Sequence, residues 1–184
     1  MHAVKGLLGK RADGFQCMWD TLKAMKKDSY LIVETGTTRI PNNWEGDGQS
    51  TRIWDMFAKE SNGKVFSVDI CPNACAVANS LVIGDDVTVV CGDSVNFLST
   101  FSQKGEIDLL YLDSFDIDVN NPHNSSFHHM KELTAIFSSL SPSCIIAVDD
   151  NIPGIGKGRY VREFLESVGY RVIYDGYQIV MSKA

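Results

Sequence analysis

The chain has 184 residues, of which 44% are hydrophobic, and its formal net charge at pH 7 is −6. This length and apolar content can bury one sizeable core, so we expect a single domain over residues 1–184. The acidic balance argues against a nucleic-acid partner, since phosphate binding normally uses clustered Lys and Arg. No apolar run reaches the about 18 residues of a membrane helix, and the five cysteines form no CxxC pair. We therefore expect a cytoplasmic protein with reduced thiols, no membrane contact and a small-molecule substrate.

Segments with helical and strand periodicity alternate along the chain. Phe15, Met18, Trp19 and Leu22 recur at helical spacing, and an apolar run at 30–33 follows them. We expect helices within residues 15–27, 50–60, 72–83, 93–101, 123–140 and 159–169. We expect strands at 30–33, 64–70, 87–92, 106–113, 144–150, 170–176 and 177–183.

The pattern of these elements indicates their arrangement. Near-continuous apolar strands that alternate with helices are typical of a parallel sheet covered by helices on both faces. The last two strands are joined only at Asp175 and Gly176, which predicts a hairpin and therefore one antiparallel strand near the C-terminus. The predicted fold class is α/β, with a seven-stranded and mostly parallel sheet.

A glycine and a carboxylate follow the first two strands. Gly36 comes just after the first strand, where it lets the backbone turn sharply and approach a ligand. Asp69 lies at the end of the second strand, where a carboxylate can accept both hydroxyls of a ribose. Ligands of an open parallel sheet bind beyond the carboxyl ends of its strands, so both residues are candidates for an adenosine site. The alternatives are that Gly36 only forms a turn and that Asp69 caps the helix near Pro72.

The order of elements and five short motifs resemble the class I methyltransferases that use S-adenosyl-L-methionine (SAM) and have a Rossmann-like fold. The motifs are VETGT at 33–37, VDI at 68–70, CGDS at 91–94, IDLLYLD at 107–113 and IIAVDDN at 145–151. The resemblance implies SAM as the cofactor and a seventh strand inserted antiparallel against the sixth. The cofactor-binding positions that we expect on this basis are Glu34, Gly36, Thr37, Gly46, Gly48, Ser50, Asp69, Ile70, Asp93, Ser94 and Asp113.

Two parts of this expected site have alternatives. Asp93 or Ser94 can also be an ordinary N-cap of the helix that follows. The glycine-rich segment of the family usually runs directly into a helix, whereas residues 37–45 intervene here. Long ordered loops are often functional lids, so Arg39 and Trp44 are candidates to cover the cofactor. The alternative is an exposed loop without a role.

Two other functions fit parts of the sequence. A dinucleotide fingerprint can be read at Gly46 and Gly48 with Thr51 in its third position, which would indicate an NAD-binding oxidoreductase. A non-catalytic nucleotide-binding or scaffold protein would keep the fold without the reaction. Titration with SAM and NAD distinguishes a methyltransferase from an NAD-binding oxidoreductase. Turnover of an acceptor distinguishes an enzyme from a scaffold protein.

Acidic residues gather after the fourth and fifth strands, at Asp113, Asp116 and Asp118 and at 149–150, which Asn151 follows. Neighbouring strands lie about 4.8 Å apart, so the oxygens at their ends converge, and a hard divalent cation would relieve their repulsion. The pattern resembles the metal-dependent O-methyltransferases of the catechol and macrolide-sugar types. This resemblance implies methyl transfer to a hydroxyl of a small molecule with Mg²⁺ as a second cofactor. The expected metal ligands are Asp113, Asp149, Asp150 and Asn151.

The metal prediction assumes that no lysine lies nearby to balance the carboxylates. The alternative is that Asp113 is a solvated strand end and that 149–151 forms a turn or a helix cap. We expect the cation to bind the acceptor hydroxyl and lower its pKa.

The resemblance does not supply the proton acceptor. The catechol-type enzymes have a lysine three residues beyond the first Asp, and this position is Asp116 here. His123, His128 and His129 lie in the segment expected to overhang the site, and the unperturbed pKa of histidine lies near neutrality. We take Asp113, His128 and His129 as catalytic candidates and expect at most one of the adjacent histidines to reach the site. The identity of the acceptor stays open, as does a homodimer that would complete its site.

Overall fold

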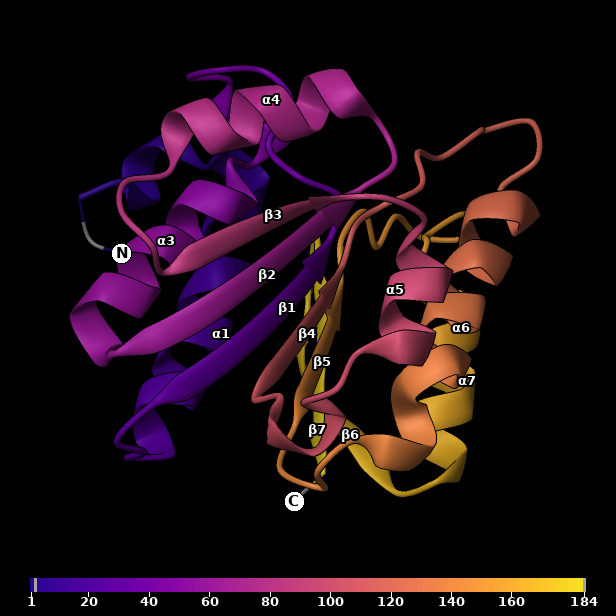
Figure 1. The fold of residues 1–184 in the computed structure, drawn as a ribbon. Coiled ribbons are helices and arrows are strands. Elements are labelled where there is room, and N and C mark those ends of the chain that lie inside the picture. Colours follow the sequence, from indigo (N-terminus) through magenta and orange to yellow (C-terminus); the bar gives the residue numbers. More distant parts are fainter. Residues whose placement is uncertain (2, 184) are drawn as a thin grey trace.

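A seven-stranded sheet forms the centre of the computed structural model, which describes residues 1 and 3–183 (Figure 1). Its strands are β1 (Tyr30–Thr35), β2 (Gly63–Asp69), β3 (Val87–Cys91), β4 (Leu109–Leu112), β5 (Ile145–Val148), β6 (Tyr170–Asp175) and β7 (Ile179–Lys183). They lie in the order β3-β2-β1-β4-β5-β7-β6. The strands β1 to β5 pair in parallel, and β7 lies antiparallel between β5 and β6. The predicted mostly parallel sheet with one antiparallel strand is confirmed.

Six α-helices of the described residues lie where the sequence predicts them. They are α1 (Ala12–Ala24), α3 (Ser50–Ser61), α4 (Pro72–Leu81), α5 (Ser94–Thr100), α6 (His123–Ile136) and α7 (Arg159–Ser167). The short helix α2 (Trp44–Asp47) lies inside the loop after β1, where the sequence shows no helical period. Single 3-10 turns occur at Lys5–Leu7, Gly9–Arg11, Lys104–Glu106 and Phe137–Ser139. None of the helices within 1 and 3–183 combines the length and the apolar character needed to cross a bilayer.

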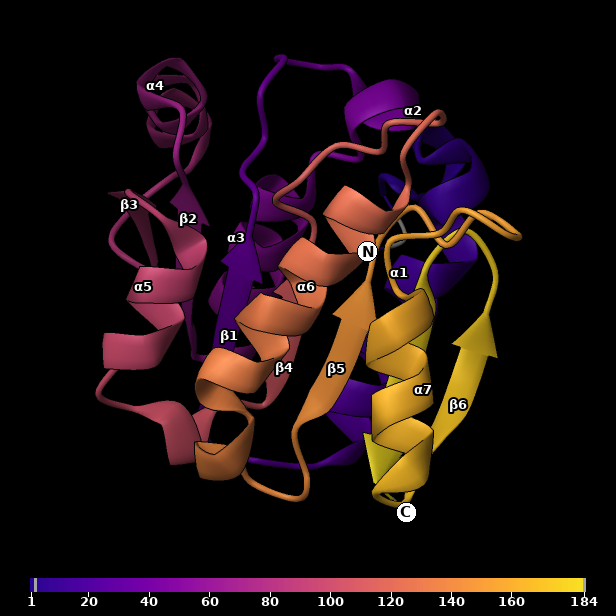
Figure 2. The ribbon, with the colours of Figure 1, turned by 90° about the vertical axis from the view of Figure 1, so that its right-hand side faces the viewer.

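The helices form two layers that bury both faces of the sheet. The helices α1, α3 and α4 lie on one side, and α5, α6 and α7 lie on the other, which Figure 2 turns toward the viewer. Side chains alternate along β1, so that Ile32 packs in the first layer and Val33 in the second. Phe15, Trp54 and Tyr111 pack together in the first layer with ring centroids 5.5–5.8 Å apart. Burial of this kind contributes about 1.5–3 kcal/mol for each large side chain, so each layer stabilises the sheet.

The strand order reverses next to β1, because β1 pairs with β2 on one side and with β4 on the other. The carboxyl ends of β1, β2 and β4 therefore diverge into helices on opposite faces and leave a crevice between them. Gly36 follows β1 at this point, with a φ of +83° and its N–H donating to Val68 O at 2.8 Å. A Cβ atom on Gly36 would meet the carbonyl oxygen of Asp113. The glycine is thus required for the close approach of the ends of β1 and β4.

This geometry predicts that Gly36→Ala destabilises the fold. The left-handed backbone costs a non-glycine residue about 1–2 kcal/mol, and the contact with the main chain at Asp113 adds about 1–3 kcal/mol. Gly84→Ala is a matched control, because Gly84 has a φ of +93° and no atom within 4 Å of an added Cβ. The free energy of unfolding, measured in urea, should fall about twice as far for Gly36→Ala as for the control. Equal losses would contradict the steric part of the argument.

Candidate functional site

A cavity of about 280 Å³ lies at the carboxyl ends of β1, β2 and β4. Residues that follow these strands form most of its wall, and the N-terminal Arg11 and the loop after β1 complete it. The lining residues are Arg11, Gly36, Thr37, Arg39, Gly46, Asp47, Asp69, Ile70, Cys71, Asp113, Ser114, Asp116 and Asp150. The cavity therefore lies at the switch point, where an open parallel sheet binds its ligand.

Asp69 is fixed at the wall of this cavity by two backbone amides. Its Oδ2 accepts from Thr37 N at 3.0 Å, and its Oδ1 accepts from Cys71 N at 2.8 Å. A carboxylate has about four lone-pair sites, so these two bonds leave acceptor capacity for a ligand. Ile70, the next residue, lines the cavity with 72% of its surface exposed. Asp69 thus stabilises the turn before α4, and it also offers the cavity a preorganised acceptor.

Glu34 and Ser50 lie behind the cavity wall instead of lining it. Glu34 is fully buried, and its Oε1 accepts from Ser67 Oγ at 2.7 Å, whereas its Oε2 has no partner among the described residues. Burial raises the pKa of Glu34 from its ordinary value of 4.5 to about 7. Side-chain alternation explains its position, because Glu34 is two residues from Ile32 and therefore faces the same helix layer.

Asp93 and Ser94 also lie outside the cavity lining. Asp93 is the N-cap of α5, and its side chain accepts from Asn96 N at 2.8 Å. Ser94 is buried, with its Oγ 3.2 Å from His128 Nε2. Asp93 thus has the capping contact that the sequence analysis gave as the alternative, and Ser94 packs against α6.

The loop between β1 and α3 forms part of the cavity wall. Arg39 Nε lies 3.2 Å from Asp47 Oδ1 within the loop, and Arg39 Nη1 lies 2.9 Å from Asp116 Oδ2 in the loop after β4. Gly46 lines the cavity, whereas Gly48 ends α2 with a φ of +75°. The direct strand-to-helix turn of a dinucleotide fingerprint is absent from this described part of the chain.

Trp44 does not line the cavity and packs against Arg52 instead. The guanidinium of Arg52 lies over its ring at 4.7 Å from the centroid. Of the two residues expected to cover a ligand, only Arg39 lies at the cavity.

The three predicted carboxylates meet beside the cavity. One oxygen each of Asp113, Asp149 and Asp150 lies within 4.8 Å of the others, because β4 and β5 pair and end together. Asn151 points away from them. Its Nδ2 donates to Asp175 Oδ1 at 2.8 Å and to Gly176 O at 3.1 Å, which ties it to the β6–β7 hairpin.

Two buried cations balance these carboxylates. Lys157 has 1% of its surface exposed, and its Nζ lies 2.7 Å from Asp113 Oδ1 and 3.0 Å from Asp150 Oδ2. Arg11 Nη2 lies 2.9 Å from Asp149 Oδ2 and 3.4 Å from Asp150 Oδ1. The expectation that no lysine lies near the carboxylates was therefore wrong.

The charge state of the cluster follows from this pairing. Burial raises the pKa of Asp113 well above its usual range, although the Lys157 ammonium opposes the shift. Burial likewise raises the pKa of Asp149, with Arg11 opposing it. Burial would also raise the pKa of Asp150, but Lys157, Tyr177 and Arg11 together outweigh it and lower that pKa. Burial would lower the pKa of Lys157, but the three aspartates outweigh it and raise that pKa, so the amine stays charged.

This arrangement does not fit a divalent cation held by three carboxylates. Both oxygens of Asp149 have partners, since Tyr111 Oη donates to Oδ1 at 3.0 Å and Arg11 binds Oδ2. The Lys157 ammonium lies between Asp113 and Asp150, where such a cation would have to bind. Two positive charges already face three carboxylates, so a further double charge would leave the site with an excess of positive charge.

The predicted histidine bases do not line the cavity. His129 is fully buried, and burial lowers its pKa to about 4. His128 Nε2 lies 3.3 Å from Glu132 Oε1, which in turn accepts from Ser114 Oγ at 2.6 Å. His123 packs against Tyr160 outside the cavity, with its Nδ1 2.6 Å from the hydroxyl. Of the catalytic candidates, only Asp113 is part of the cavity wall.

Arg11 and Lys157 are the site residues that the sequence analysis missed. Lys157 had a signal, because it stands between Gly156 and Gly158 shortly after the acidic pair. A Cβ on Gly156 would meet the main chain of Ile152, so the loop is tightly folded at that point. No comparable signal marks Arg11.

Known proteins resemble this chain in sequence family and in fold. A family model described as a methyltransferase domain matches residues 45–151. The O-methyltransferase NovP superposes with a TM-score of 0.63 at 14% identity, over 95% of this chain and 80% of its own. A putative methyltransferase from Streptococcus mutans, solved with S-adenosylhomocysteine (SAH), superposes with a TM-score of 0.61 at 11% identity, over 95% and 98%.

A third similar structure belongs to a longer chain. The MycE methyltransferase of the mycinamycin pathway, solved with Mg and SAH, gives a TM-score of 0.53 at 15% identity, over 94% of this chain and 48% of its own. No curated protein matches the chain significantly. At these identities the solved structures show the fold alone.

The buried Glu34 predicts a specific pH dependence of stability. Its folded pKa of about 7 exceeds the ordinary value of 4.5, so the folded state binds more protons between these values, and stability falls as pH rises through them. Glu34→Gln removes this loss and should stabilise the protein by up to about 3 kcal/mol at pH 8, with little difference near pH 5. Denaturation in urea at several pH values measures it.

The comparison must be made between the variant and the parent at each pH. His129 has the opposite effect in an overlapping window, because its lowered pKa makes stability rise with pH, and subtraction removes this common contribution. A difference between the two proteins that does not change from pH 5 to pH 8 would contradict a raised pKa for Glu34.

Proposed function

Because the chain belongs to the methyltransferase-domain family, we propose that it transfers the methyl group of SAM to a hydroxyl of a small molecule. The observation that carries the proposal is the charge of the cavity at the switch point. Five of its seven charged lining residues are acidic, namely Asp47, Asp69, Asp113, Asp116 and Asp150, against Arg11 and Arg39. SAM carries a sulfonium and an ammonium against one carboxylate, so an acidic cavity attracts it, whereas a pyrophosphate would be repelled.

Asp69 and Ile70 would hold the adenosine part of the cofactor. The Asp69 carboxylate is already oriented by Thr37 N and Cys71 N, so it can accept from ribose hydroxyls without reorganisation. The exposed side chain of Ile70 beside it offers an apolar surface to the adenine ring. These contacts leave the sulfonium end of SAM toward Asp113 and Asp150.

Asp113 is the group placed to accept the proton of the acceptor hydroxyl. Lys157 binds its Oδ1, which orients the carboxylate and leaves Oδ2 for the acceptor. In the reaction the sulfur–methyl bond breaks as the oxygen–methyl bond forms, the hydroxyl proton passes to Asp113, and SAH leaves.

We also propose that Lys157 and Arg11 take the place of the expected Mg²⁺. They supply the positive charge that the three carboxylates require, and they do so from fixed and buried positions. The Mg found with MycE belongs to that protein, whose chain is about twice as long. The role of the acidic cluster is then to hold Asp113 in place.

The cofactor proposal predicts that SAM and SAH bind at one site, as measured by isothermal titration. Asp69→Asn should weaken SAM binding by about tenfold, because a hydrogen bond to a charged acceptor contributes about 1.5–3 kcal/mol. Asp93→Asn is the matched control, since Asp93 lies outside the cavity and asparagine also caps helices. Binding of NAD without SAM would favour the oxidoreductase alternative. Binding of SAM without turnover on any hydroxyl acceptor would favour a scaffold protein.

The cation proposal predicts that EDTA leaves methyl transfer unchanged. The assay measures SAH formed from SAM with a pool of phenolic and sugar alcohols, after EDTA treatment and again after addition of Mg²⁺. Lys157→Met should abolish turnover and lower the free energy of unfolding by about 3–5 kcal/mol, because it leaves buried carboxylates uncompensated. Loss of activity in EDTA that Mg²⁺ restores would reinstate the metal mechanism.

A further inference from the structure

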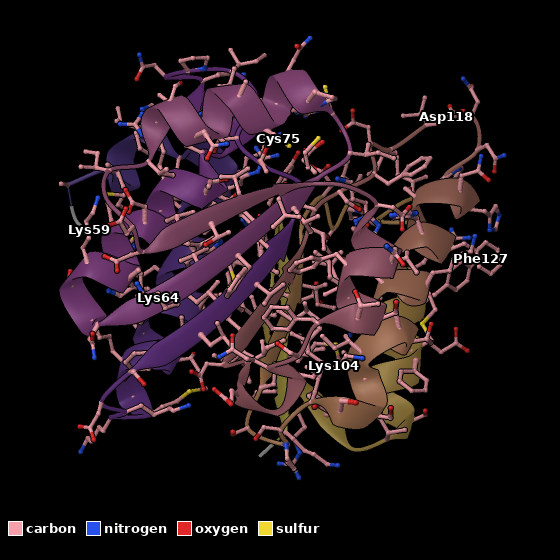
Figure 3. The ribbon with its side chains drawn as sticks, in the orientation of Figure 1. Lys59, Lys64, Cys75, Lys104, Asp118 and Phe127 are labelled. Carbon is pink, nitrogen blue, oxygen red and sulfur yellow. The ribbon has the colours of Figure 1, made fainter. Side chains whose placement is uncertain are left out.

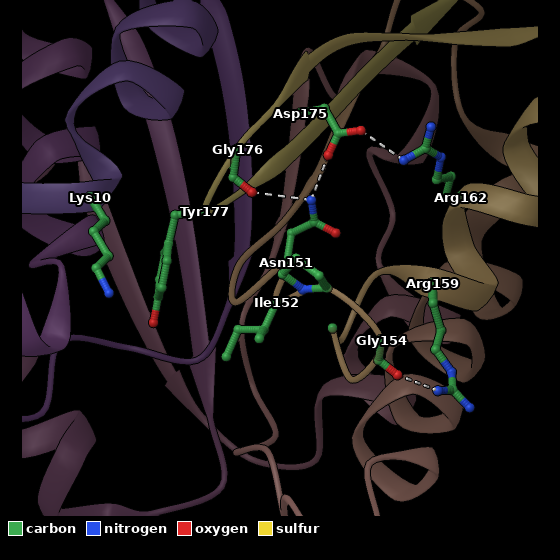
Figure 4. A pocket seen from close by; sticks show the side chains of 11 residues that line it. Lys10, Asn151, Ile152, Gly154, Arg159, Arg162, Asp175, Gly176 and Tyr177 are labelled. Carbon is green, nitrogen blue, oxygen red and sulfur yellow. Dashed lines mark hydrogen bonds and ion pairs between the residues drawn. The ribbon is translucent and has the colours of Figure 1, made fainter.

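A second and larger cavity, of about 1030 Å³, lies on the other side of the Asp150–Asn151 step. The loop after β5, the start of α7, the β6–β7 hairpin and the N-terminal Lys10 surround it (Figure 4). Its volume is at the upper end of the range for small-molecule sites, about 300–1,000 Å³. The proposed function assigns nothing to this cavity.

The lining of the larger cavity is cationic, although the protein as a whole is acidic. Three cationic side chains, Lys10, Arg159 and Arg162, face one anionic side chain, Asp175. Arg162 Nη1 and Asp175 Oδ2 pair at 2.8 Å, so these two largely neutralise each other (Figure 4). Lys10 and Arg159 are left as the excess positive charge of the cavity.

Neither of these two cations is paired with a carboxylate in the described part of the chain. Arg159 Nη1 donates to Gly154 O at 3.1 Å, and its Nη2 donates to Tyr160 Oη at 3.0 Å. Lys10 is exposed and has no ion-pair partner in residues 1 and 3–183. In Figure 4 they lie on opposite sides of the cavity, with Tyr177 beside Lys10 and Ile152 between them. An anion is the ligand that this pair of charges fits.

The larger cavity adjoins the acidic one through a shared wall. Asp150 lines the smaller cavity and Asn151 the larger one. Arg11, which lines the smaller cavity, lies over the ring of Tyr177, which lines the larger one, at 4.6 Å from the centroid. A molecule in the larger cavity therefore lies next to the carboxylates at the ends of β4 and β5.

We infer that the larger cavity is the acceptor site and that it selects small molecules bearing a carboxylate or phosphate group. Lys10 and Arg159 bind the anionic group, and Tyr177 and Ile152 contact the apolar part. The hydroxyl to be methylated extends past Asp150 into the smaller cavity, where it meets Asp113 Oδ2 and the methyl group of SAM. The role as acceptor site rests on the proposed methyl transfer, whereas the anion binding rests on the cavity alone. Opposite charges then separate the two binding ends, with cationic SAM in the smaller cavity and the anionic group of the acceptor in the larger one.

The test is titration with two probes that have the same shape and different charge, 4-hydroxybenzoate and 4-hydroxybenzamide, each with and without SAM. The benzoate should bind at least about tenfold more tightly than the amide, and inorganic phosphate should compete with it. Arg159→Gln should weaken benzoate binding about tenfold and Lys10→Gln about threefold. Lys104→Gln is the control for net charge, because Lys104 precedes β4 at the opposite end of the sheet (Figure 3).

The outcomes separate this inference from the proposed function. Charge-selective binding that both variants weaken and the control does not would support the anion site, even if SAM does not bind. Lys10 is exposed, so Lys10→Gln keeps the test valid if Arg159→Gln fails to fold. Equal binding of the two probes, or binding that neither variant changes, would overturn the inference while SAM binding stands. Tighter binding of a short oligonucleotide than of either probe would overturn the small-molecule class.

Discussion

Three carboxylates at the ends of two neighbouring strands are the constraint on which the site depends. The parallel pairing of β4 and β5 places Leu112 opposite Val148, so Asp113 and Asp149 emerge side by side. Buried charges of one sign are strongly unfavourable unless cations meet them with good geometry. Arg11 meets this requirement from a position 138 residues before Asp149, and Lys157 meets it from the loop that follows Asp150. The surrounding fold therefore positions both cations against the carboxylates.

The position of Arg11 also stabilises the loop after β1, which lines the smaller cavity. Its Nη1 donates to Glu45 O at 2.9 Å, so the residue that balances Asp149 also holds α2 in place. A Cβ on Gly48 would contact the Arg11 side chain, and the positive φ of Gly48 ends α2 there. The long insertion after β1 is therefore an ordered wall of the site. Its order comes from a hydrogen bond to the N-terminal segment and from Arg39, with no regular strand of its own.

The sequence predicts what local periodicity and strand geometry determine. The strands, the helices, the antiparallel β7 and the convergence of Asp113, Asp149 and Asp150 all follow from apolar spacing and from the shared edge of parallel strands. The direction of Glu34 was predictable as well, because it shares a face of β1 with the buried Ile32. Arg11 and Lys157 were not predictable in the same way, because Arg11 lies in a short 3-10 turn and Lys157 in a loop, and the tertiary fold determines where these segments lie. Asp93 shows the converse case, in which the local capping role is visible in the structure and was already predictable from the sequence.

The segment from Asn151 to Gly158 takes part in both cavities. Its residues Ile152, Gly154 and Gly156 line the larger cavity, while Lys157 reaches the carboxylates beside the smaller one. Lys157 N also donates to Asp150 O at 3.2 Å, so the segment cannot move without disturbing the ion cluster. Under the proposed binding of SAM in one cavity and an anion in the other, a ligand that restricts this segment from one side would also restrict it for the second ligand. Thermodynamic linkage would then make each ligand change the affinity of the other by the same factor.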